Sequence, residues 1–109
     1  MTTRTLQILL ALAEGPLHGY GIKQKVEERT AGEVRLGSGT LYEAVHRLMA
    51  QRLIEEVDSP AGEPSSGGPP RRVYSLTATG RKSLQEELRR MDDVVRYARG
   101  RDLLPDARG

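Results

Sequence analysis

The last third of the chain carries the feature that most restricts its fold. Apolar side chains recur there at steps of four, three, four and three residues, at Leu84, Leu88, Met91, Val95 and Ala98. This spacing is typical of the contact face of a helix in a coiled coil. The pattern predicts a helix over about 78–99, capped by Thr77 and ended by Gly100. Such a helix needs another helix to cover its apolar face.

The composition excludes several classes of protein. A chain of 109 residues forms one domain. It has no Cys, so disulfides, thiolate nucleophiles and Cys-ligated metals are excluded, and its two His are too few for an ordinary zinc site. We therefore expect no metal and no other cofactor. The absence of Phe and Trp leaves a thin core, which favours stabilisation by a second copy of the chain.

The N-terminal apolar stretch over residues 6–13 resembles a signal peptide only superficially. It is short, and Gln7 interrupts it. The chain also has no apolar run long enough to cross a bilayer. These observations predict a cytoplasmic protein without a membrane partner.

Helical periodicity predicts three helices in the first half of the chain. The first is capped by Thr2 or Thr3 and stopped by Gly15-Pro16, and the second runs over about 20–30. The third runs over about 39–52, and Ser38 is placed to cap it. The alternating residues 34–36 could form a very short strand between the second and third helices.

Two alternating segments, 53–57 and 71–76, flank a Pro-, Gly- and Ser-rich loop over 59–70. This pattern predicts a β-hairpin with a long tip. The expected fold is therefore mainly α with a small β-hairpin, in the order of a winged helix-turn-helix. We expect the DNA-binding domain at 1–76, a C-terminal dimerisation helix at 77–100 and a flexible tail at 101–109.

No set of residues in the sequence has the spacing of a catalytic site. Ser38 lacks glycines at the flanking positions of a nucleophile elbow, and Gly80-Arg81-Lys82 breaks the spacing of a phosphate-binding loop. The adjacent carboxylates at 86–87 and 92–93 point in different directions on a helix. We therefore predict that the protein is not an enzyme.

The third helix carries the side chains expected of a DNA reader. In a helix-turn-helix unit the second helix of the pair enters the major groove by its first turns. Here those turns carry Ser38, Gly39, Thr40, Tyr42, His46 and Arg47. Basic residues on the neighbouring elements are expected to contact phosphates, namely Lys23, Lys25, Arg35, Arg71 and Arg72. His46 could instead be a solvent-exposed residue, and Arg71-Arg72 could serve only the solubility of the hairpin.

The charge distribution leaves alternatives open. Residues 1–58 carry seven basic and eight acidic side chains, a net charge of −1, whereas residues 59–109 carry ten and seven, a net charge of +3. The helix-turn-helix half is therefore not basic in total. A winged-helix protein-interaction module without specific DNA binding is the main alternative. A ligand-only sensor with an effector site at the dimer interface is the second, and an enzyme is a distant third.

Five segments along the chain form a further pattern, namely Leu9–Leu12, Gly15–Tyr20, Gly39–Tyr42 with Leu48, Leu53–Glu55 and Arg72–Arg81. Together they resemble the PadR family of transcriptional regulators, which is named for the phenolic acid decarboxylase regulator. The resemblance covers about residues 6–99, in the order of the family. Each segment alone is weakly specific, whereas the set is specific.

The resemblance implies a homodimer that binds pseudo-palindromic operator DNA, usually as a repressor, with release by a small-molecule effector left open. It implies that Tyr42 and the start of its helix face DNA and that the wing contacts the backbone. It also implies that the first helix packs against the last across the dimer. The dimer interface would then consist of Leu6, Leu9, Leu10, Leu84, Leu88, Met91, Val95 and Ala98.

The chain departs from the family pattern at a few positions. Ser38 stands where the family often has Pro, and Arg52 where it often has Gly. Because Arg does not favour a left-handed backbone, we expect a less regular turn into Leu53. Some small relatives bind flat drugs between aromatic side chains, and Tyr97 as the lone aromatic residue of the last helix argues against such a site.

Overall fold

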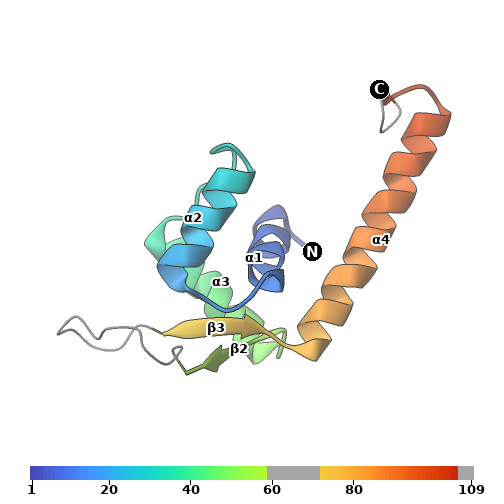
Figure 1. Cartoon of the computed structure of the whole chain (residues 1–109). Helices are drawn as coiled ribbons and strands as arrows, with labels where there is room; N and C mark the ends of the chain where they lie inside the picture. Colours follow the sequence, from blue (N-terminus) through green and yellow to red (C-terminus); the bar gives the residue numbers. More distant parts are fainter. Residues whose placement is uncertain (59–71, 106–109) are drawn as a thin grey trace.

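A computed structural model describes residues 1–58 and 72–105 of the chain. Its helices are α1 (Thr3–Ala13), α2 (Gly19–Arg29), α3 (Ser38–Ala50) and α4 (Ala78–Gly100), and its strands are β1 (Leu17–His18), β2 (Ile54–Val57) and β3 (Val73–Leu76). Helices α1 to α3 lie together on one side of the sheet, and α4 stands away from them (Figure 1). The expected winged-helix class, mainly α with a small sheet, is confirmed. The predicted wing tip at 59–70 and Arg71 lie outside the described residues.

The sheet has the strand order β1-β3-β2 and is antiparallel throughout. The predicted hairpin strands pair with Ile54 opposite Leu76 and Val57 opposite Val73. Strand β1 was not predicted, because a two-residue segment shows no alternation. The strand expected at 34–36 is wrong: the Thr30 hydroxyl accepts a hydrogen bond from Val34 N at 3.1 Å, and Leu36 is buried in the core.

Helix α1 lies at the centre of the core. It buries Leu6, Ile8, Leu9, Ala11 and Leu12, and it contacts α2, α4 and β3. The remaining core side chains come from every other helix and from both hairpin strands, including Ile22, Val26, Leu41, Val45, Leu48, Ile54, Tyr74 and Leu84. The first helix is therefore covered on more than one face by elements of its own chain.

Two of the predicted helix caps are confirmed and one is wrong. The side chain of Thr2 accepts a hydrogen bond from Thr5 N at 3.2 Å, and that of Thr77 accepts one from Gly80 N at 2.9 Å. Helix α3 begins at Ser38 itself, with Gly37 as its N-cap residue. Its first turn is closed by the Gly37 carbonyl, which accepts from Leu41 N at 2.9 Å. Ser38 lies inside the helix and is not its cap.

The turn that follows α3 is regular despite Arg52, so the expected irregularity is also wrong. Arg52 adopts a left-handed backbone with φ 59°. Leu53 N donates to Leu48 O at 3.0 Å, and Arg52 N donates to Met49 O at 3.0 Å. These two bonds are those of a Schellman motif, in which glycine is the usual left-handed residue. These two hydrogen bonds offset the steric cost of the Arg52 Cβ at a positive φ.

The same turn joins α3 to the start of α4. Thr77 N donates to Leu53 O at 3.1 Å, and the Thr77 hydroxyl lies 2.7 Å from Arg52 O. A Cβ added at Gly80 would lie only 1.9 Å from Leu53 O. Because a backbone oxygen cannot move aside like a side chain, this joint requires glycine at position 80.

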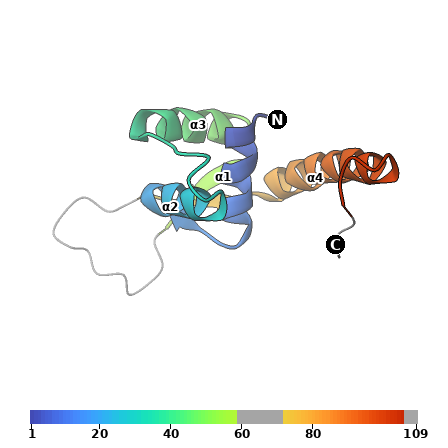
Figure 2. The same cartoon turned by 90° about the horizontal axis from the view of Figure 1, so that it is seen from above.

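Helix α4 leaves the packed part of the molecule after its second turn. Gly80 and Leu84 are its buried residues, whereas Leu88, Met91, Val94 and Tyr97 are exposed. The molecule is accordingly elongated, with extents of 57 × 27 × 26 Å, and α4 extends away from the other helices (Figure 2).

The C-terminal turn folds back on α4. Leu103 N donates to Ala98 O at 2.9 Å, and the Arg101 guanidinium lies 5.1 Å from the centre of the Tyr97 ring. Asp102 holds the left-handed position of this turn with φ 60°. The first part of the predicted flexible tail is therefore bonded to the helix end, and 106–109 lie outside the described residues.

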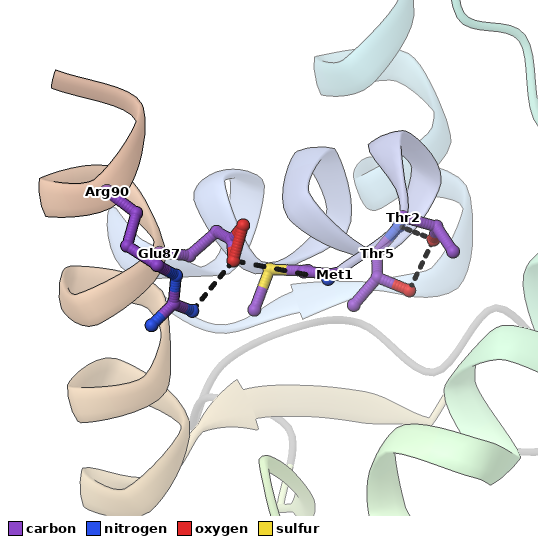
Figure 3. Close-up of polar contacts among 5 residues, drawn as sticks. All are labelled: Met1, Thr2, Thr5, Glu87 and Arg90. Atoms are coloured by element: carbon purple, nitrogen blue, oxygen red, sulfur yellow. Dashed lines mark hydrogen bonds and ion pairs between the residues drawn. The ribbon is translucent and has the colours of Figure 1, made fainter. Parts of the chain in front are cut away.

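Polar contacts tie the beginning of the chain to α4 before the helix departs. Glu87 lies 4.0 Å from the amino group of Met1 and accepts a hydrogen bond from Arg90 at 2.9 Å (Figure 3). The hydrogen bond from Arg90 holds the pKa of Glu87 below its usual value. Thr2 and Thr5 bond to each other at the adjacent end of α1.

Candidate nucleic-acid interface

Helix α3 buries one face and exposes the other. Leu41, Ala44, Val45 and Leu48 point into the core. The outer face carries Ser38, Gly39, Tyr42, Glu43 and His46, all of them exposed. Thr40 is half-buried at the edge of this face. The structure therefore brings most of the predicted base-reading side chains together on one polar surface, which we call the α3 face.

Tyr42 is positioned by a glycine on another helix. A Cβ added at Gly19, the first residue of α2, would lie 3.0 Å from the Tyr42 hydroxyl. The phenol therefore rests on bare backbone while 46% of Tyr42 remains exposed. Gly19 was not predicted as part of the site, because nothing in a local pattern indicates a contact with a residue 23 positions away.

Arg47 lies at the edge of the α3 face that borders α1. Its guanidinium donates to the Thr5 hydroxyl at 3.4 Å. It also lines a cavity of about 370 Å³ together with Arg4, Thr40 and Glu43. The structure thus places Arg47 against α1, apart from Tyr42 and His46. Its predicted base-reading role stays a prediction, and its position favours it less than theirs.

The basic residues expected to contact phosphates are distributed over several elements. Lys23 is half-buried on α2, and Arg35 is exposed in the connection to α3, where its Nε donates to Gly32 O at 3.3 Å. Lys25 points the other way and forms an ion pair with Glu14 at 3.0 Å. Lys25 therefore holds α2 to the end of α1 and is a poor candidate for a phosphate contact.

At the base of the wing, Arg72 lies beside a carboxylate and a phenol. Its Nε is 3.7 Å from Glu56 Oε1 on the neighbouring strand. Burial raises the pKa of Tyr74, Glu56 and Tyr42 add to the rise, and Arg72 opposes it through its charge and a hydrogen bond. Tyr74 is therefore a neutral, fixed hydroxyl beneath an exposed guanidinium. Arg71 lies outside the described residues.

The residues predicted for the dimer interface divide into two groups. Leu6, Leu9 and Leu84 are buried within a single protomer and have almost no surface to offer a partner. Their predicted place in the interface stays a prediction, and their burial in this chain's own core favours it less than it favours the exposed residues. Leu10, Val95 and Ala98 are half-buried, and Leu88 and Met91 are exposed. The exposed apolar side chains of α4 are thus Leu88 and Met91, together with Val94 and Tyr97.

Further cavities lie at the junctions between elements. One of about 450 Å³ lies between α1, α3 and α4 and is lined by Thr5, Arg47, Gln51, Ser83 and Arg90, among others. Another of about 560 Å³ lies between the end of α3, β2 and the start of α4. Within residues 1–58 and 72–105, no cluster of His, Asp or Glu could hold a metal ion, and no helix is long and apolar enough to span a membrane.

Two relatives are similar to most of the chain. It is 32% identical over 95 residues to the transcriptional regulator Rv3488 of Mycobacterium tuberculosis, which covers 87% of this chain and 81% of the relative. It is 38% identical over 84 residues to a 37.1 kDa protein encoded in a transposon of Streptomyces fradiae. That match covers 77% of this chain and 21% of the relative, so the chain spans about a fifth of its length.

Solved structures show the same fold. A PadR family transcription regulator from Clostridium difficile R20291 superposes with a TM-score of 0.74 at 28% identity, over 91% of this chain and 97% of that one. Bacillus subtilis PadR, solved in complex with operator DNA, superposes with a TM-score of 0.66 at 22% identity, over 80% and 47%. The protein family described as "Transcriptional regulator PadR-like family" matches residues 8–86 of this chain. Since this match covers most of the chain, including the α3 face and the hairpin strands, the chain belongs to the PadR-like family of transcriptional regulators.

Proposed function

We propose that this protein is a cytoplasmic, homodimeric repressor that binds pseudo-palindromic operator DNA. The observation that carries the proposal is the α3 face, an exposed polar helix surface that lies on the same fold as a hairpin with Arg72 at its base. A helix presented in this way fits the major groove, and the hairpin is then suited to contact the adjacent backbone. The relative from Bacillus subtilis, which was solved with operator DNA, supports this use of the fold.

The α3 face would read the bases. His46 and Tyr42 offer a ring donor or acceptor and a phenol, Thr40 offers a hydroxyl and a methyl group, and Ser38 and Gly39 allow close approach. Lys23, Arg35, Arg71 and Arg72 would supply the phosphate contacts, which dominate affinity but not sequence preference.

Selection of bound fragments from genomic DNA by the full-length protein tests this proposal. We expect an enriched motif of two related half-sites, and their spacing would report the separation of the two α3 faces. Recovery of no motif, together with binding that does not weaken with salt, would favour the protein-interaction module suggested by the net charge of −1 over residues 1–58.

Single substitutions separate base reading from phosphate contact. His46→Ala should weaken binding to the selected fragment more than to random DNA, whereas Arg72→Ala should weaken both alike and flatten the salt dependence by about 0.9 in slope. Arg47→Ala is the informative third variant. Equal loss on both DNAs for Arg47→Ala would remove this residue from the base-reading set and agree with its contact to Thr5.

We propose that residues 1–76 form the DNA-binding domain and that α4 holds the homodimer. The uncovered apolar residues of α4, with Leu10 of α1, would meet those of a second copy. Leu88, Met91, Val94 and Tyr97 are all exposed along this one helix, and apolar side chains gathered in this way are typical of an interaction surface. Sedimentation of the full chain should show a dimer, and the double variant Leu88→Asp, Met91→Asp should sediment as a monomer. A wild-type monomer at high concentration would contradict the proposal.

A small-molecule effector would fit this arrangement at the cavity of about 450 Å³ between α1, α3 and α4. A ligand there would contact both the DNA-reading helix and the helix assigned to the dimer, so its binding could change their relative orientation. A thermal-shift screen with small organic acids and amines tests this part, with Ser83→Leu, which narrows the cavity, as the control. A compound that raises the melting temperatures of the wild type and of Ser83→Leu equally does not bind in this cavity.

A further inference from the structure

Arg72 lies between a buried group and an exposed one. The Tyr74 phenol beside it is 1% exposed and belongs to the core. The Glu56 carboxylate, 3.7 Å from Arg72 Nε, belongs to a side chain that is 47% exposed. In the sheet register Glu56 stands directly opposite Tyr74, so all three groups meet at the base of the wing. The guanidinium is thus oriented by the phenol and neutralised by the carboxylate.

The ion pair between Arg72 and Glu56 is easily exchanged. Arg72 keeps 65% of its side-chain exposure, and exposed pairs at such distances contribute little to the free energy of folding. A DNA phosphate is a better partner for arginine, because it can accept two parallel hydrogen bonds from the guanidinium. The pair with Glu56 must then be given up, and its loss opposes binding.

We infer that Glu56 holds Arg72 in the free protein and that Arg72 exchanges this carboxylate for a DNA phosphate on binding. This inference rests on the proposed DNA-binding function and assigns to Glu56 a role in it. Glu56 lowers the affinity for all sequences alike, because the contact that it competes with is made to the DNA backbone. A lower affinity for random-sequence DNA leaves more of the protein free to search for its operator.

The neighbouring residue provides a matched control. Glu55 is also exposed and lies on the same strand, one position before Glu56. Successive side chains of a strand point to opposite faces of the sheet, so Glu55 points away from Arg72. Replacing either residue by Gln removes the same charge from the same strand. Only Glu56→Gln removes the partner of Arg72.

The experiment measures the affinity of the full-length protein for a random-sequence duplex over a series of potassium chloride concentrations. Glu56→Gln should bind about twofold to fivefold more tightly than wild type, with a steeper salt dependence. Glu55→Gln should change the affinity less. In an Arg72→Ala background, Glu56→Gln should lose its advantage over wild-type Glu56, because there is no guanidinium left to release.

Other outcomes overturn the inference. Equal gains from Glu55→Gln and Glu56→Gln would show a general charge effect. A gain that persists without Arg72 would show direct repulsion of DNA by Glu56 and no exchange of partners. Thermal unfolding of each variant verifies that the hairpin still folds. If wild type binds DNA and the two Gln variants do not differ, this inference alone fails; if wild type binds no DNA, the proposed function fails with it.

Discussion

The two ends of α4 lie in opposite environments although they belong to one continuous helix. Around Gly80 and Leu84 the helix is packed against α1 and the end of α3, with backbone contacts too close for any side chain. From Leu88 onward the same apolar spacing continues at positions that the described part of the chain leaves exposed or half-buried. One sequence pattern therefore serves two purposes. Its first repeat completes the protomer, and the later ones carry the surface that we propose binds a second copy.

The largest contrast between the two ends is expected for a methyl group added at a glycine. Gly80→Ala would place a Cβ 1.9 Å from Leu53 O, so the joint between α3 and α4 must open. We expect a loss of about 4 kcal/mol or more in the free energy of unfolding, measured by urea denaturation. Gly100→Ala is the control, because a Cβ there meets nothing within 4 Å. Similar stabilities for the two variants would contradict the close contact at Gly80.

A smaller contrast is expected for truncation of two leucines four residues apart. Leu84→Ala should cost about 2–3 kcal/mol at any protein concentration, because Leu84 is 3% exposed and its removal leaves a cavity. Leu88→Ala, at a position 37% exposed, should cost the protomer less than about 0.5 kcal/mol.

Concentration distinguishes the two leucines further. Dimerisation makes unfolding dependent on protein concentration, so Leu88→Ala should lower the melting temperature only where the wild type is dimeric. Scanning calorimetry at two concentrations checks this. A cost for Leu88→Ala that does not change with concentration would place Leu88 in the protomer core and erase the difference between the two ends.

The smallest contrast concerns two left-handed residues that are not glycine. Arg52 ends α3 in the packed region, and Asp102 ends α4 beyond it. Arg52→Gly should stabilise the fold by about 0.5–1 kcal/mol, because it relieves the strain of a Cβ at positive φ. Asp102→Gly should leave the global stability unchanged, since the end of α4 can fray without unfolding the core. Chemical denaturation measures the free energy of unfolding of both variants. An equal increase for the two would show that α4 unfolds as one unit with the core.

Local sequence patterns predicted much of the fold for identifiable reasons. The caps at Thr2 and Thr77 and the pairing of the two hairpin strands depend on residues close in sequence or on simple alternation. The polar surface around Tyr42 and His46 followed from helical spacing alone. Strand β1 and the N-cap of α3 were missed, because two residues carry no period and a helix can begin one residue early without changing its pattern.

The site depended more on distant contacts. Gly19 supports Tyr42, Thr5 draws Arg47 toward α1, and Glu56 holds Arg72. Each of these pairs joins residues on different elements, so no window of sequence contains both partners. The number and type of basic residues could be read from the sequence, whereas the faces that present them could not.

By itself, the sequence determined that α4 has an apolar face with coiled-coil spacing, because this depends only on the period of the helix. The tertiary structure alone decided how this face is divided between the protomer and the solvent. The division falls after Leu84, because the close contact of Gly80 with Leu53 sets the angle at which α4 leaves the core, and a straight helix then moves away from α1. Leu88 and Met91 are thereby exposed, although they continue the spacing that begins at Leu84.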